Sequence, residues 1–221
     1  MKIKAIITGA TGMVGEGVLH ECLEDKNVES VLVIHRKPGG FTHPKLKEIV
    51  LNDFFDLSSI EPQLKGYNAC FFCLGISSIG LNEEQYHKIS HDLTLHFAKT
   101  LQKQSPEATF CYVSGAGTDS SEKGKVMWAR VKGKTENDLL QIGFKAAFNF
   151  RPGYMHPTPG LKNTLPYYKY FTWAYPALRR FFPKQVTTLA ELGKAMLAVA
   201  QKGYGKNTIE VPDIVVLAKR G

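Results

Sequence analysis

The sequence predicts an α/β protein in which helices cover both faces of a doubly wound parallel sheet. Short apolar runs alternate with helix-like segments along the chain, which is the pattern of repeated strand–helix units. The apolar runs are nearly continuous, as expected for strands that are covered on both faces. A glycine-rich turn joins the first apolar run to the first helical segment. With 221 residues, 43% of them hydrophobic, we expect one domain over residues 1–221.

Each element follows from its local pattern. The nearly continuous apolar runs predict strands at residues 3–7, 31–34, 48–51, 69–74, 109–113 and 146–150. The segments between them predict helices at residues 14–24, 58–65, 83–104 and 125–142. A helix at 189–201 and a last apolar stretch at 208–217 complete the predicted domain.

Residues 161–183 depart from this pattern because they are crowded with tyrosine, phenylalanine and tryptophan. Pro166, Pro176 and Pro183 interrupt the segment, so one long helix is not expected there. Such aromatic density suits a substrate lid, a dimer face or a membrane-surface patch, and equally an appendage packed on the core. The dimer-face interpretation would make the protein a homo-oligomer.

Charge and hydropathy narrow the expected partners and location. The net charge is +8, but the cations are scattered and no zinc-finger or helix-turn-helix signature is present. We therefore expect no nucleic-acid partner, and a phosphate-bearing small molecule fits the charge. No run approaches the roughly 18 apolar residues that span a bilayer. The first strand leads directly into the glycine-rich turn without a signal peptide, so the expected location is cytoplasmic.

Cys70 and Cys73 form a C-x-x-C string, which is typical of metal and redox sites. Both residues lie in a predicted buried strand, where residues three apart point to opposite faces of the sheet. We therefore expect two separate thiols in apolar surroundings and neither a metal site nor a redox pair.

The turn after the first strand carries the strongest functional signal. It reads Gly9-Ala10-Thr11-Gly12-Met13-Val14-Gly15. Three glycines spaced in this way permit a tight turn and a close backbone approach to a pyrophosphate, which the N–H groups at the following helix start would hold. A purely structural turn is the alternative. The position between a strand and a helix is the context of a Rossmann-type turn, and it predicts a dinucleotide cofactor.

The end of the second predicted strand selects between the two nicotinamide cofactors. Sites for NAD(H) place an acidic residue there for the ribose 2′-hydroxyl, whereas this chain has His35, Arg36 and Lys37. Arginine can pair with a 2′-phosphate and stack on adenine, which lysine does less well. We therefore expect a preference for NADP(H) over NAD(H). The alternative is a solvated loop with ordinary surface charge.

The glycine-rich turn is accompanied by the pair Asp53-Phe54 after the third predicted strand and by Cys73-Leu74-Gly75 after the fourth. Together these three motifs resemble the short-chain dehydrogenase/reductase superfamily, from about residue 3 to residue 160. The match is to its atypical branch, near small NAD(P)-dependent epimerase/dehydratase-like proteins and Tat-interacting-protein oxidoreductases. The resemblance implies that Asp53 bonds the adenine amino group and that Phe54 lines the adenine pocket. It also implies that the turn after the fourth strand passes over the ribose and pyrophosphate; this turn consists of Cys73, Leu74, Gly75, Ile76 and Ser77. A third segment, after the sixth strand, is implied to lie near the nicotinamide and consists of Arg151, Pro152, Gly153 and Tyr154.

The same resemblance implies a catalytic centre of serine, tyrosine and lysine. Ser114 ends the fifth predicted strand, and Lys132 fits the lysine position on the next helix. Trp128 stands four residues before Lys132, where the family has its tyrosine. The indole N–H does not titrate in the working range, so Trp128 cannot transfer the proton.

Two functions remain open at this point. In the first, the chain is an NADP(H)-dependent oxidoreductase for a carbonyl or carbinol of unspecified structure, and Tyr154, His156 or water supplies the proton. In the second, it binds NADP(H) without catalysis, as a sensor or a partner-binding protein. Ser114 and Lys132 are expected at the cofactor in both cases.

Three histidines, His87, His91 and His96, lie on the predicted helix 83–104. The step of four residues from His87 to His91 suits two metal ligands on one helix face. Because no glutamate stands between them in an H-E-x-x-H arrangement, we interpret them as helix surface and expect no metal.

Overall fold

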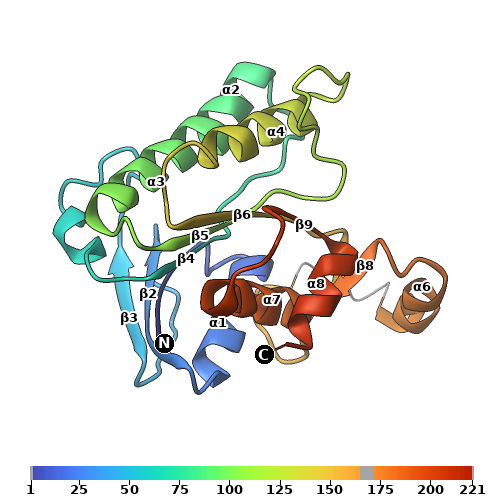
Figure 1. Ribbon diagram of the computed structural model, residues 1–221, viewed down its shortest axis with the longest axis horizontal. Helices are drawn as coiled ribbons and strands as arrows, with labels where there is room; N and C mark the ends of the chain where they lie inside the picture. The colour runs from blue at the N-terminus through green and yellow to red at the C-terminus, as the bar shows by residue number, and fades with distance from the viewer. Residues whose placement is uncertain (1, 165–171, 221) are drawn as a thin grey trace.

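The computed structural model describes residues 2–164 and 172–220. Its centre is a seven-stranded sheet in the order β3-β2-β1-β4-β5-β6-β9, and all neighbouring strands run parallel (Figure 1). The strands are β1 Ile3–Thr8, β2 Val28–His35, β3 Leu46–Val50, β4 Ala69–Phe72, β5 Thr109–Val113, β6 Ala146–Arg151 and β9 Thr208–Glu210. The strand order reverses between β1 and β4, which confirms the predicted doubly wound fold.

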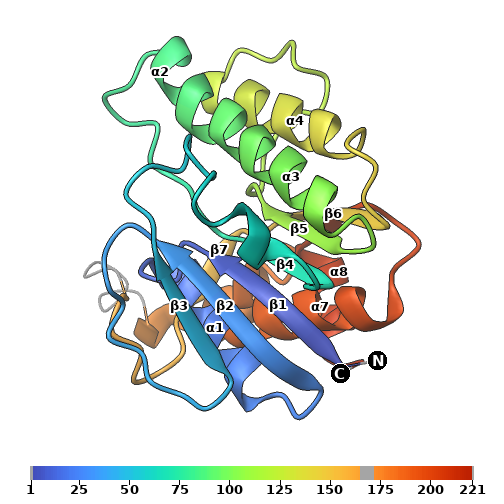
Figure 2. The ribbon, with the colours of Figure 1, turned by 90° about the vertical axis from the view of Figure 1, so that its left-hand side faces the viewer.

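Helices cover both faces of this sheet, as predicted (Figures 1 and 2). One layer contains α1 (Met13–Glu24), α7 (Leu189–Lys202) and α8 (Val211–Ala218). The opposite layer contains a helix built from α2 (Glu83–His87), the π turn η2 (Lys88–Asp92) and α3 (Leu93–Gln104), together with α4 (Met127–Leu139).

The strands alternate between two hydrophobic cores. On β1, Ala5 and Ile7 belong to the core under α1 and α7, whereas Ile6 belongs to the core under α3. Successive side chains of a strand point to opposite faces, and here both faces are covered. This packing explains why the strand sequences are apolar at nearly every position.

The same alternation separates the C-x-x-C thiols. Cys70 is buried in the core under α3, whereas Cys73 packs against the core under α1 and α7. Both are free cysteines, and burial raises the pKa of the Cys70 thiol well above its usual range. The thiolate that metal and redox chemistry needs is therefore disfavoured, and the predicted apolar role is confirmed.

Several predicted boundaries differ from the structure. The helix predicted at 58–65 is wrong, because only one 3-10 turn, η1 (Glu61–Leu64), forms there. Asp56 Oδ1 accepts the N–H and hydroxyl of Ser58, and this local turn competes with helix formation. The apolar stretch 208–217 divides into β9 and α8, with Pro212 in the first turn of that helix.

Residues 172–183, the described later part of the aromatic segment, lie at the edge of the molecule. A 3-10 turn, η3 (Thr172–Ala174), leads into α6 (Tyr175–Phe181), which stands beyond β8 (Val186–Thr188) in Figure 1. Strand β8 pairs in parallel with β7 (Tyr154–His156). Trp173 is 82% exposed. The expectations for Pro166, Tyr167, Tyr168, Tyr170 and Phe171 fall outside the described residues.

No helix in the described part of the chain is both long enough and apolar enough to cross a membrane.

Candidate cofactor and active site

The glycine-rich turn lies between β1 and α1, and its glycines have different roles. Gly9 has a φ of +74°, and a Cβ there would lie 2.8 Å from the backbone of Cys73 and Leu74. A Cβ on Gly15 would lie 2.2 Å from the carbonyl oxygen of Gly9. A Cβ on Gly12 would meet only the Gly9 oxygen, at 3.4 Å, and Gly12 begins α1 without a side-chain cap. Gly9 and Gly15 thus permit the turn, and Gly12 leaves open space at a helix start suited to a phosphate.

Two cavities meet at this turn. The Arg36 cavity, about 720 Å³, reaches the end of β2 and includes Arg36 and Phe54 in its lining. The Lys132 cavity, about 370 Å³, reaches the end of β5 and includes Ser114 and Lys132. The residues that line both cavities are Gly12, Cys73, Leu74 and Gly75. Doubly wound sheets bind ligands at this point, outside the carboxyl ends of the strands where their order reverses.

Most of the predicted cofactor residues line these cavities. Those at the Arg36 cavity are Gly9, Thr11, Gly12, His35, Arg36, Lys37, Phe54, Cys73, Leu74 and Gly75. Those at the Lys132 cavity are Gly12, Met13, Val14, Gly15, Cys73, Leu74, Gly75, Ser114, Lys132 and Pro152. The sequence therefore identified most of the described lining of the combined cleft.

Four predicted residues are placed outside the described lining. Ala10 is buried in the core under α1, and a Cβ on Gly153 would lie 2.1 Å from the carbonyl oxygen of Gln185, so Gly153 lets β7 approach β8. The other two, Asp53 and Ser77, are exposed. Their side-chain oxygens accept backbone N–H groups two residues further along the chain and so stabilise local turns.

The end of β2 carries two exposed cations and one buried imidazole. Arg36 and Lys37 are exposed and form no ion pair in the described part of the chain. His35 is 3% exposed, and its Nε2 lies 2.8 Å from Glu48 Oε1 on β3. The same Glu48 oxygen accepts the N–H of Gly39, at 2.9 Å. Glu48 therefore fixes the loop that presents the two cations to the cavity.

Sequence reasoning missed Glu16, which holds one wall of the Arg36 cavity in place. Glu16 lies on α1 and is 4% exposed. Its carboxylate accepts the backbone N–H groups of Lys162, at 2.8 Å, and Asn163, at 2.7 Å. Both of these residues line the Arg36 cavity, so the start of the aromatic segment forms one of its walls. The sequence around Glu16 shows only that an acidic side chain stands in a helix that packs on the sheet, and it does not indicate which residues Glu16 binds.

Polar groups at the Lys132 cavity hold one another. Ser114 Oγ lies 2.5 Å from Glu136 Oε1 and 3.0 Å from the carbonyl oxygen of Phe150. Both of these oxygens can only accept a hydrogen bond, so the single hydroxyl proton of Ser114 points toward them and not into the cavity. The Lys132 ammonium donates to the carbonyl oxygen of Ser114, and Arg151 Nε donates to Glu136 Oε1 at 3.0 Å.

Glu136 is the centre of this network and was missed by the sequence analysis. It is 1% exposed and binds both the Ser114 hydroxyl and the Arg151 guanidinium. It follows Lys132 by four residues and so shares its helix face, which is the signal that could have found it. Burial lowers the pKa of Lys132 to about 8, and the nearby Glu136 carboxylate opposes this shift.

Trp128 precedes Lys132 by one turn of α4. A Cβ on Gly117 would lie 3.6 Å from the Cη2 atom of the indole, so the ring covers the loop that follows β5. The ring therefore lies next to the segment that begins with Ser114, where the related enzymes would have a titratable phenol.

The structure does not bring Tyr154 or His156 to the Lys132 cavity. Met155, between them on β7, belongs to the cavity lining. Tyr154 packs against Met13 and Leu189, outside the described lining of the cavity. The His156 ring stacks on Tyr175, with centroids 4.0 Å apart. Burial raises the pKa of Tyr154 and lowers that of His156.

Known proteins resemble this chain in sequence. Residues 5–125 match the NAD dependent epimerase/dehydratase family. Protein FMP52, mitochondrial, of Debaryomyces hansenii is 28% identical over 153 residues, which are 68% of this chain and 66% of the relative. The Candida glabrata protein of the same name is 29% identical over 153 residues, covering 68% of this chain and 63% of the relative. The matches thus span just under two thirds of these relatives.

These relatives correct one expectation. Their names place them in mitochondria, which contradicts the cytoplasmic location inferred from the first residues of the sequence. The N-terminal pattern reports only the start of β1 and does not establish a compartment.

Solved structures share the fold. UDP-N-acetylglucosamine 4-epimerase from Methanobrevibacter ruminantium M1 superposes with a TM-score of 0.67 at 16% identity, over 94% of this chain and 76% of the epimerase. The NADPH-bound carbonyl reductase from chicken fatty liver superposes with a TM-score of 0.61 at 16% identity, over 91% of this chain and 92% of the reductase. The resemblance to short-chain dehydrogenases/reductases is confirmed. From the match over residues 5–125, the chain belongs to the NAD dependent epimerase/dehydratase family.

Proposed function

We propose that this chain binds NADP(H) and uses it to interconvert a carbonyl compound and the corresponding alcohol. The observation that carries the proposal is the meeting of the Arg36 and Lys132 cavities along Gly12 and the turn 73–75. The 2′-phosphate of NADP(H) needs a cationic region at one end of the cleft, and the interconversion of carbonyl and alcohol needs a proton-transferring group at the nicotinamide end. The combined cleft offers both, separated by an uncapped helix start.

The residues present fit such a cofactor. The open space at Gly12 suits the pyrophosphate, and the exposed Arg36 and Lys37 suit a 2′-phosphate. Phe54 supplies apolar surface for the adenine ring. When bound, the nicotinamide would supply or accept the hydride.

Lys132 is the group that we propose moves the proton. Its ammonium has three N–H groups, and the Ser114 carbonyl accepts one of them. The others can bind the ribose and the substrate oxygen within the Lys132 cavity. With its pKa lowered to about 8, Lys132 can release and recover a proton close to neutral pH. Ser114 then acts as a positioning residue, because its hydroxyl donates its hydrogen bond to Glu136.

Lys162 and Asn163, at the start of the aromatic segment, would cover part of this cleft. Glu16 holds these two residues against the Arg36 cavity through two backbone hydrogen bonds. Trp173 and Phe181, further along, are largely exposed and offer apolar surface to a second copy of the chain.

The second candidate function is NADP(H) binding without catalysis. Trp128 favours it, because the indole stands where a titratable phenol is needed. The non-catalytic function is also favoured because the Ser114 hydroxyl already donates its hydrogen bond to Glu136.

Calorimetric titration with NADPH and NADH tests the binding proposal. We expect tighter binding of NADPH, and we expect Arg36→Ala to weaken it by about 1.5–3 kcal/mol, or roughly 10- to 150-fold, while NADH binding is unchanged. The matched control is Lys65→Ala, which removes an exposed cation outside both cavities. Equal affinity of the unmodified chain for the two cofactors would exclude the assigned preference.

Turnover separates the two candidate functions. NADPH oxidation is measured with a panel of aldehydes and ketones, and Lys132→Met should abolish it. Tight NADPH binding with no turnover of any carbonyl would favour the non-catalytic function.

A further inference from the structure

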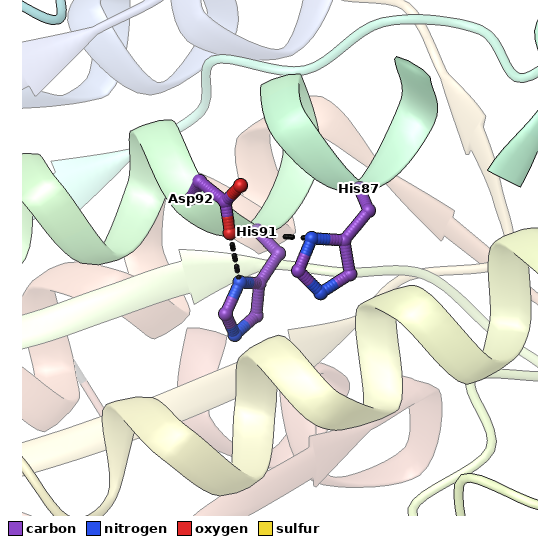
Figure 3. A group of neighbouring side chains, drawn as sticks. All are labelled: His87, His91 and Asp92. Carbon is purple, nitrogen blue, oxygen red and sulfur yellow. Dashed lines mark hydrogen bonds and ion pairs between the residues drawn. The ribbon is translucent and has the colours of Figure 1, made fainter. Parts of the chain in front are cut away.

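Three side chains that commonly ligate metals converge on the helical layer formed by α2, η2 and α3. His87 ends α2, and His91 and Asp92 lie in the π turn η2. One ligand atom from each lies within 4.8 Å of the other two. His91 Nδ1 lies 2.7 Å and His87 Nδ1 lies 3.2 Å from the same atom, Asp92 Oδ1. Figure 3 shows both rings turned toward this carboxylate.

The π turn is what brings Asp92 to the two histidines. The N–H of Leu93 bonds to the carbonyl of Lys88, five residues earlier, so this turn holds one more residue than an α-helical turn. His87 and His91 are four residues apart, and Asp92 is five residues after His87. In a regular α-helix, only the four-residue step would share a face. Interruptions of this kind are frequently found at functional sites.

Both nitrogens of His91 face carboxylates. Its Nδ1 contacts Asp92, and its Nε2 lies 2.8 Å from Asp138 Oδ2 on α4. Carboxylates only accept hydrogen bonds, whereas a neutral imidazole has a single N–H. One nitrogen of His91 therefore needs either a second proton or a metal ion. A metal ion at Nδ1 would also satisfy His87, whose Nδ1 approaches the same Asp92 oxygen.

The surroundings match the requirements of a metal site. Asp138 on Nε2 gives the carboxylate–histidine–metal arrangement that orients ligating imidazoles, and Lys134 Nζ fixes Asp138 at 2.9 Å. Tetrahedral zinc with bonds of 2.0–2.1 Å separates its ligand atoms by about 3.3 Å, close to the 3.2 Å between His87 Nδ1 and Asp92 Oδ1. The 2.7 Å between His91 Nδ1 and Asp92 Oδ1 is a hydrogen-bond distance, and it would widen by about 0.6 Å when the ion enters. A hollow of about 480 Å³ beside His87 and Asp92 leaves room for water as a fourth ligand.

We propose that His87, His91 and Asp92 bind one divalent transition-metal ion. Two imidazole nitrogens with one carboxylate oxygen form a donor set that suits Zn²⁺ better than Mg²⁺ or Ca²⁺, which prefer oxygen ligands. The ion would hold α2 and α3 together across the π turn and, through Asp138, tie them to α4. None of these residues belongs to the described lining of the two cofactor cavities, so the site is independent of the proposed activity.

The test is a calorimetric titration of the untagged full-length chain with Zn²⁺. We expect one equivalent to bind, His91→Ala and Asp92→Asn to remove this binding, and Asp138→Asn to weaken it by about 10- to 100-fold. The matched control is His20→Ala, a histidine of α1 outside the cluster, which should bind Zn²⁺ like the unmodified chain. Absence of binding by the unmodified chain, or unchanged binding by His91→Ala, would overturn the proposal.

A spectroscopic measurement covers the case in which a variant fails to fold. In the unmodified chain, Zn²⁺ should shift the ¹⁵N resonances of His87 Nδ1 and His91 Nδ1 and leave that of His20 unchanged. If Zn²⁺ leaves these resonances in place and His91 carries protons on both nitrogens, a proton serves the role assigned to the metal and the proposal is wrong.

Discussion

The two ends of the cleft use charge in opposite ways. At the Arg36 cavity, Arg36 and Lys37 are exposed and form no ion pair within the described residues, so they are available to an anionic ligand. At the Lys132 cavity, Glu136 is 1% exposed and is bound by Ser114 and Arg151. The difference follows from burial, because a buried charge must find partners within the protein whereas an exposed cation is solvated.

The two ends of the cleft therefore differ in what their residues do: those at one end recognise the ligand, and those at the other also stabilise the domain. At the phosphate-binding end, Gly12, Arg36 and Lys37 should be replaceable without unfolding the sheet, since Gly12 faces open space and the two cations are exposed. Residues of the Lys132 end hold β5, α4 and β6 together, so the same groups that shape the proposed active site also stabilise the domain.

The largest expected effect is at the phosphate-binding end. Gly12→Val should abolish binding of NADPH and NADH, because the side chain would fill the space assigned to the pyrophosphate. The free energy of unfolding should fall by only about 1 kcal/mol, since a poorer residue then begins α1. Calorimetry and urea denaturation measure the two quantities. Gly205→Val, at an exposed glycine where an added Cβ would meet no heavy atom within 4 Å, is the control. Normal cofactor affinity in folded Gly12→Val would place the ligand elsewhere.

At Glu136 the main expected effect is on the stability of the domain and not on cofactor binding. Glu136→Ala should lower the free energy of unfolding by about 3 kcal/mol, the lower end of the range for breaking a buried ion pair, because Arg151 keeps Glu210 as a partner. Urea denaturation measures the change, and Glu107→Ala, at an exposed loop residue, serves as the control. A loss as small as that of the control would show that the network does not stabilise the domain.

A smaller effect is expected at Trp128. Trp128→Tyr should raise carbonyl reduction by about 10²-fold, at the low end for general acid catalysis, because the Ser114 hydroxyl stays with Glu136. Steady-state NADPH oxidation measures the gain, which should vanish when Lys132→Met is added. Trp173→Tyr, at the exposed tryptophan, should change nothing. If Trp128→Tyr binds NADPH and gains no activity, a phenol at position 128 does not reach the reacting oxygen at the Lys132 end.

The smallest expected effect is a dependence of the reduction rate on pH, set by the amine of Lys132. Reduction requires the protonated amine, and burial lowers its pKa to about 8. The kcat/KM for reduction should therefore be constant below pH 8 and fall about tenfold per pH unit above it, while alcohol oxidation rises toward pH 8 and then levels. Lys132→Arg should lose this inflection, because arginine does not deprotonate in this range. A flat profile for the unmodified chain would remove Lys132 as the proton donor.

Local patterns determined the fold and one end of the cleft. Apolar runs of strand length and the glycines of the first turn act through neighbouring residues, so their consequences are readable along the chain. Coverage of both sheet faces, the separation of Cys70 from Cys73, and the placement of Arg36 and Lys37 at the cleft all followed from such patterns.

The tertiary structure alone decided the contacts between distant segments. Glu16 binds Lys162 and Asn163 across 146 and 147 residues, and His91 meets Asp138 across 47 residues, without any local signal for either pairing. The packing of β7 placed Met155 in the described lining of the Lys132 cavity and Tyr154 against Met13 and Leu189. Such contacts depend on how strands and helices pack, because a side chain's partners are fixed only when whole elements come together in one register.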